Sequence, residues 1–166
     1  MPLLVLQDGQ VPAHFPAPLD RMYVDYIKAQ WDLTGDLDES SGNISFKNGY
    51  PLFYSPFEIS IMQIQTIRDE DLDPITFRAH TDLGILVRML KQDDTTGQPN
   101  PEMKEMEDEV NDISADYQSY SLFGIEQIQY ISTNYQTFHN QPTDKNAESD
   151  WRCVITHRLI YTVRKV

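Results

Sequence analysis

The feature that most constrains the fold is the alternation of apolar and polar side chains in residues 151–163. Successive side chains of a β-strand point to opposite faces of its sheet, so the pattern predicts one strand of about 16 residues, where five or six are usual. One face carries Trp151, Cys153, Ile155, Leu159, Tyr161 and Val163. The other carries Arg152, Thr156, Arg158, Thr162 and Arg164. The chain is therefore expected to contain a sheet with one apolar and one polar face.

Three more segments have the character of strands. From residue 75 to residue 89 the odd positions other than Thr81 are apolar, which predicts a second long strand. Residues 59–67 are rich in isoleucine but their apolar positions change parity midway, so a strand with a β-bulge is expected there. A turn is expected at residues 69–74, and residues 122–135 predict another strand.

Two segments have the spacing of amphipathic helices. In residues 19–31 the apolar side chains recur every three to four positions, and a glycine follows the segment. A second helix is predicted over residues 101–113, because Asn100 can cap it, Pro101 suits its first position, and its apolar side chains also have helical spacing. The outer faces of this second helix are strongly acidic.

Local patterns also predict hairpins. Asn48-Gly49 lies between apolar residues and tolerates positive φ, so a short hairpin is expected in residues 44–53. Residues 61–67 match residues 125–131 at five of seven positions, and each copy precedes a polar turn and an alternating strand. The match indicates either a doubled hairpin unit or a chance similarity of isoleucine-rich strands.

These elements predict an α+β fold, with an antiparallel sheet built from long hairpins and flanked by two amphipathic helices. Residues 19–166 are expected to form a single domain. Residues 1–18 hold four of the ten prolines and are expected to form an extended arm. Because they are too apolar to leave in water, Leu3, Leu4 and Leu6 are expected to cover this subunit's core or to dock on a neighbour.

Composition sets the broad class of protein. The chain has 166 residues with 40% hydrophobic and 23% charged side chains, as an ordinary soluble domain has. It has one cysteine and no long apolar run, so we expect a soluble protein of a reducing compartment, with no disulfide, no membrane span and no four-cysteine zinc site. The net charge of −13 disfavours direct nucleic-acid readout and predicts a solvated acidic surface.

No residue pattern indicates a catalytic or cofactor-binding site. Residues 36–42 resemble a calcium loop in their alternating oxygens, but the glycine comes one residue late and the twelfth position is Lys47, so a polar turn is preferred. Cys153 and His157 lie about 13 Å apart on a strand, so Cys153 is expected to be a buried structural thiol. The histidines, at positions 14, 80, 139 and 157, lack the spacing of a zinc site. We expect no enzyme activity, cofactor or metal.

The arginines of the last strand suggest an interface. Arg152, Arg158 and Arg164 recur every six residues on one face, a repeat of about 20 Å. One interpretation is that they pair with acids of the same chain. The other is that they meet the acidic surface of an identical neighbour and give charge complementarity around a ring.

The order of the segments 19–31, 75–90, 101–113 and 151–166 resembles that of the tail-terminator and neck proteins of tailed bacteriophages. These are small α+β subunits of ring assemblies. The resemblance implies a structural virion protein made in the host cytoplasm, in which a homo-hexameric ring joins the tail tube to the head connector, without catalysis or cofactor. Its partners would be further copies of itself and neighbouring virion proteins. The proline-rich arm departs from the family plan, which leaves an adaptor, stopper or baseplate role open.

Two other function classes stay open. A small acidic protein that acts as a monomer or dimer could engage a basic partner through its acidic face. An enzyme of unrecognised type comes third. A monomer at high concentration would favour the binding protein, whereas rings seen by electron microscopy would favour the virion protein.

Overall fold

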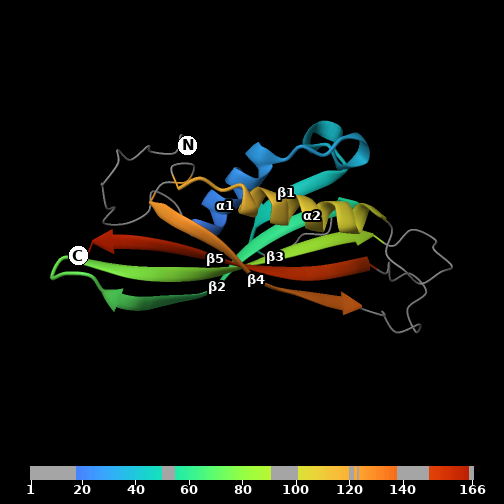
Figure 1. The fold of residues 1–166 in the computed structure, drawn as a ribbon. Helices are drawn as coiled ribbons and strands as arrows, with labels where there is room; N and C mark the ends of the chain where they lie inside the picture. The colour runs from blue at the N-terminus through green and yellow to red at the C-terminus, as the bar shows by residue number, and fades with distance from the viewer. Residues whose placement is uncertain are drawn as a thin grey trace.

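The computed structural model describes residues 18–49, 55–90, 101–119, 122, 124–137 and 150–164. The fold is α+β, as predicted, with two helices and a five-stranded sheet (Figure 1). In chain order the helices and strands are α1 (Leu19–Gln30), β1 (Ile44–Asn48), β2 (Phe57–Asp71), β3 (Thr76–Leu90), α2 (Pro101–Ala115), β4 (Ile125–Thr137) and β5 (Asp150–Arg164). Two short 3₁₀ turns, Gly35–Leu37 and Glu39–Ser41, lie between α1 and β1.

The sheet has the strand order β1-β2-β3-β5-β4. Strands β2, β3, β5 and β4 pair antiparallel, and β3 and β5 form its centre, in register from the pair Thr76 and Arg164 to the pair Leu90 and Asp150. The four predicted strands are thus confirmed as β2, β3, β4 and β5, although β3 begins one residue after the predicted start at 75 and β4 begins three residues after the predicted start at 122.

Strand β1 corrects one prediction, the hairpin in residues 44–53. It pairs in parallel with the first five residues of β2, and residues 50–54 lie outside the described residues. Gly49 does adopt a positive φ of 89°, but its N–H donates to the carbonyl oxygen of Ile61 at 2.8 Å. Gly49 therefore has the positive φ that the sequence predicts, but in the described structure it follows the last residue of a parallel strand.

Both helices cover the same face of the sheet (Figure 1). Helix α1 contacts β1 and β2, and α2 contacts β3 and β4. Each helix buries one stripe of side chains, as its periodicity predicts: Leu19, Met22, Tyr23, Val24, Tyr26 and Ile27 from α1, and Met103, Met106, Glu107, Val110, Ile113 and Ser114 from α2. We call the covered side of the sheet the helix face and the other side the open face.

The helix face holds the core. Odd-numbered residues of β3 and β5, such as Ile85, Cys153 and Ile155, are fully buried there. The prediction that Cys153 is a buried thiol is confirmed. The predicted core face of the last strand leaves out His157. That prediction is wrong, because the side chain of His157 is also fully buried on this face.

Strands β2 and β4 each contain two register shifts. In β2 the extra residues are Ile64 and Asp69, which confirms the predicted bulge, and the strand continues into the expected turn as far as Asp71. In β4 they are Glu126 and Ile131, so the two bulges are five residues apart in both strands. The hairpins β2–β3 and β4–β5 are therefore alike in architecture. The bulges and the sequence repeat align the two hairpins differently. The bulge at Ile64 corresponds to the bulge at Glu126, whereas the repeat aligns Ile64 with Ile128.

Candidate assembly surface

In the part of the chain that the structure describes, the exposed large apolar side chains gather on the outer strands of the sheet and on one turn. Each of them exposes at least 38% of its surface. Three lie on β2, two on the turn between β2 and β3, and three on β4: Met62, Ile64, Ile67, Leu72, Ile75, Tyr130, Ile131 and Tyr135. Large apolar side chains grouped in this way mark surfaces that bind another molecule.

Strand β2 changes character at its sixth residue. Its first five residues are buried because they lie between β1 and β3, whereas all ten residues from Met62 to Asp71 are exposed. Within the described residues, no strand pairs with the outer side of this second part. We call residues 62–71 the β2 edge. Its first six residues, 62–67, carry no charge.

Strand β4 forms the opposite margin of the sheet. In the described part of the chain it pairs with β5 alone, so its outer side is also unpaired. We call Ile125–Thr137 the β4 edge. Only Glu126 is charged among its thirteen residues. Exposed edges are usually protected from pairing with other chains by charged residues, prolines or covering segments, and this edge has one charge and no proline.

The most exposed large apolar side chain of the β2 edge packs over a glycine of the neighbouring strand. Ile64 is 57% exposed and lies across Gly84 of β3. A Cβ atom at position 84 would come within 3.1 Å of Cδ1 of Ile64, with Val154 of β5 on its other side. The missing side chain at Gly84 therefore lets Ile64 rest flat on the open face.

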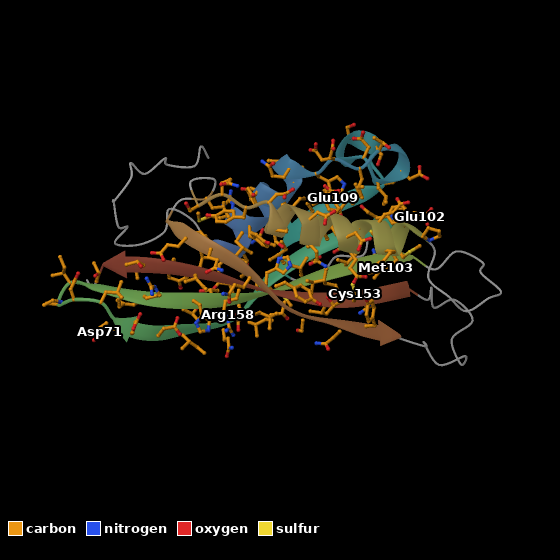
Figure 2. The ribbon with its side chains drawn as sticks, in the orientation of Figure 1. Asp71, Glu102, Met103, Glu109, Cys153 and Arg158 are labelled. Carbon is orange, nitrogen blue, oxygen red and sulfur yellow. The ribbon has the colours of Figure 1, made fainter. Side chains whose placement is uncertain are left out.

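The structure pairs Arg158 within its own chain. The side chain lies on the open face (Figure 2), where Nε donates to Oδ1 of Asp82 at 2.8 Å and Nη2 donates to Oδ2 at 3.3 Å. Gln65 of β2 donates a third hydrogen bond to the same carboxylate. The hydrogen bond from Arg158 holds the pKa of Asp82 below its usual value. For Arg158, the interpretation of pairing with local acids is the one that this geometry supports.

The other predicted interface residues are placed less fully. Arg152 is half-buried on β5, in register with Arg88 and Gln136 of the neighbouring strands. Arg164 ends β5 opposite Thr76, and its side chain is not among those described. Leu3, Leu4 and Leu6 lie outside the described residues, as does the arm up to residue 17.

Two further arginines of the open face also have intrachain partners. Arg88 is buried beside Glu58, with Nη2 at 3.3 Å from Oε2, and it donates to the carbonyl oxygen of Ser55. Arg78 of β3 has Nη1 at 3.2 Å from Glu70 of β2 and Nε at 3.9 Å from Glu126 of β4. The open face is thus crossed by charge pairs, most of them between neighbouring strands and one reaching from β3 across β5 to β4.

The buried histidine joins three elements on the helix face. The hydroxyl of Tyr23 in α1 lies 2.6 Å from Nδ1 of His157, and Oδ1 of Asn111 in α2 lies 3.0 Å from Nε2. Burial lowers the pKa of His157 to about 4, so the ring is neutral at pH 7. A neutral ring accepts from Tyr23 at Nδ1 and donates to Asn111 from Nε2. Sequence reasoning missed this cluster because its members are 46 to 134 positions apart.

Two sequence motifs weighed for chemistry have structural roles. Burial raises the pKa of the Cys153 thiol to about 12, and His157 is hydrogen-bonded to other residues. In the calcium-like segment, Oδ1 of Asp38 accepts hydrogen bonds from the backbone N–H and the hydroxyl of Ser40. That segment forms two 3₁₀ turns, as a polar turn would. Within the described residues, no three His, Cys, Asp or Glu side chains are grouped so that they could hold a metal ion.

Comparison with known proteins adds no family. No family model matches the chain, and a search of curated proteins finds no match. Among the described residues, no helix has the length and apolar character needed to cross a membrane. Function must therefore be argued from the geometry of the surface.

Proposed function

We propose that this chain is a ring-forming structural subunit of a tailed bacteriophage, of the tail-terminator or neck kind, made in the host cytoplasm and built into the virion. The single observation that supports self-assembly is that, among the described residues, the exposed large apolar side chains lie on β2, the following turn and β4. The phage assignment is supported by the order of the elements along the chain, which resembles that of these ring proteins.

The chemistry of this surface favours another copy as the partner. The chain carries a net charge of −13, yet residues 62–67 are uncharged and Ile125–Thr137 carries one charge. An uncharged apolar strip gains most by contact with another of the same kind, because burial of apolar area drives association. A second copy of the chain brings such a strip with it.

A binding protein with a basic partner is the second candidate. It is favoured by the outer side of α2, where Glu105, Asp108 and Asp112 are exposed. Lys104 pairs with Asp108, with Nζ at 2.9 Å from Oδ1, so part of this charge is neutralised within the helix. This candidate does not explain the apolar outer strands.

Negative-stain electron microscopy and analytical ultracentrifugation of the full chain test the proposal. We expect closed rings at high protein concentration, of six subunits if the family resemblance holds. A protein that stays at 19.3 kDa at every concentration would contradict self-assembly and favour the binding protein.

A further inference from the structure

The two unpaired edges share part of a sequence repeat, in which residues 62–67 match residues 126–131 at four of six positions. Residues 61–67 and 125–131, which match at five of seven positions, lie on the outer strands of the two hairpins. Each contains two glutamines, Gln63 and Gln65 in one and Gln127 and Gln129 in the other. The repeat thus places similar isoleucine- and glutamine-rich chemistry on opposite margins of one sheet, with Glu126 as its one charged residue.

The directions of the strands suit these edges to each other. Strand β2 is antiparallel to β3, β3 to β5, and β5 to β4, so β2 and β4 run in opposite directions. A second copy placed beside the first along the sheet presents its β2 edge antiparallel to the first copy's β4 edge. Antiparallel pairing would satisfy the outward N–H and C=O groups of both edges.

We infer that the β2 edge of one copy pairs with the β4 edge of the next, so that the sheet continues from subunit to subunit. This inference rests on the proposed ring and names the surfaces that form it. Pairing of like edges about a two-fold axis would use one edge of each copy and leave the other open. The head-to-tail arrangement uses both edges of every copy, and it gives a ring where the rotation closes.

The apolar side chains are placed to be covered by this contact. Ile64 and Ile67 are 57% and 42% exposed on the β2 edge, and Tyr130 and Ile131 are 53% and 41% exposed on the β4 edge. Ile64 and Ile67 lie on the open face and Tyr130 lies on the helix face, so pairing of the edges would place each of them beside side chains of the neighbouring strand on its own face.

A complementation experiment tests the arrangement. The variants are Ile64→Lys, which blocks the β2 edge, and Ile131→Lys, which blocks the β4 edge, since lysine on an edge strand opposes pairing. Ile75→Lys is the matched control, because Ile75 is 63% exposed but lies in the turn outside both edges. Sedimentation gives the mass, and thermal melting confirms that each variant is folded.

The head-to-tail arrangement predicts a particular pattern of masses. Each blocked variant alone should be a monomer, and their equimolar mixture should contain dimers of twice the monomer mass, formed by the two intact edges. The control should form rings. Dimers of either blocked variant alone would indicate two-fold pairing of like edges and overturn the inference.

A second comparison tests whether the backbone takes part. Because the carbonyl of Ile61 points toward β1, the N–H of Gln63, two residues on, points to the unpaired side. Gln63→Pro removes this N–H, and Gln63→Ala keeps it while losing the same side chain. We expect Gln63→Ala to form rings and the association constant of Gln63→Pro to fall at least tenfold.

The outcomes separate this inference from the proposed function. A wild-type protein that never assembles contradicts the ring itself. Rings that persist in Ile64→Lys, Ile131→Lys and Gln63→Pro leave the ring intact and overturn the edge pairing. If those rings are lost on removal of residues 1–17, the arm is the segment that joins the subunits.

Discussion

The two faces of the sheet are stabilised in different ways. On the helix face, side chains such as Ile85 and Ile155 are fully buried against α1 and α2, and stability comes from apolar burial. On the open face, charged side chains pair between neighbouring strands, as Arg158 does with Asp82. The polar half of an alternating strand is therefore not simply solvated, because it can link strands through charge pairs.

The largest expected effect compares a buried with an exposed pair on the open face. Glu58→Gln would leave Arg88 buried without its carboxylate, which costs about 3–5 kcal/mol of unfolding free energy. Glu70→Gln, the matched control, removes an exposed partner of Arg78 and should cost at most about 1 kcal/mol. Urea unfolding measures both values. Equal effects would show that burial does not distinguish the two pairs.

The buried His157 of the helix face gives the next comparison, between the folded and the unfolded chain at low pH. The pKa of His157 falls from 6.5 to about 4 on burial, so between these pH values the histidine is protonated in the unfolded chain and neutral in the folded chain. Stability should therefore fall as pH drops from about 6.5 toward 4, by about 2–3 kcal/mol at pH 4.5. His157→Gln should flatten this acid slope. Chemical unfolding from pH 7 to pH 4.5 measures the slopes, and an unchanged slope in His157→Gln would refute the assignment.

Arg158 gives a smaller effect, and here the structure changes the expectation from the sequence. The arginine repeat predicted that Arg158→Glu would reduce self-association more than monomer stability. Because Arg158 pairs with Asp82, the substitution should destabilise the monomer by about 2 kcal/mol. The pKa of Asp82 is lowered in the fold, so its contribution is present above pH 3.8 and is lost as pH falls through the folded pKa. In Arg158→Gln this loss at low pH should shrink, which acid unfolding would detect.

Substitution of Cys153 tests how tightly the helix face is packed, because Cys153→Ala removes a single sulfur atom from the core. Cys153→Ala should cost about 1–2 kcal/mol, and Cys153→Asp should prevent folding because it buries a carboxylate. A thiol reagent should label the folded protein only as fast as the protein unfolds. Rapid labelling would show that the helix face opens locally at this position.

The smallest effect on stability is expected from removal of residues 1–17, with Pro18 kept because its carbonyl accepts from the N–H of Met22. If the arm docks on a neighbour, the truncated domain should melt as the full chain does but assemble more weakly. Circular dichroism and sedimentation measure the two properties. A large drop in melting temperature would instead make the arm part of the core.

The sequence predicts those parts of the fold that depend on local pattern. Alternation locates β3 and β5, helical spacing locates α1 and α2, and the change of parity at Ile64 locates a bulge. It does not reveal partners far apart in the chain. The parallel pairing of β1 and the pair of Arg158 with Asp82 follow from strand order and register.

The candidate surface depends on that same long-range information. Whether a strand is central or outermost decides whether its uncharged side is covered, and no local pattern states the strand order. One signal was present in the sequence, because residues 125–137 contain a single charged side chain in a chain that is 23% charged. Such a segment is either enclosed or an unprotected edge, and the described structure makes it an edge.

The length of β1 has a consequence for how such a chain can evolve. It has five residues against the fifteen of β2, so the end of β1 at Asn48 sets how much of its neighbour is left open. A short insertion that lengthened β1 would cover the β2 edge with the subunit's own backbone and leave the core unchanged. If the edges pair as inferred, small insertions at the end of β1 would convert a ring-forming protein into a monomeric one during evolution, and small deletions there would reverse the change.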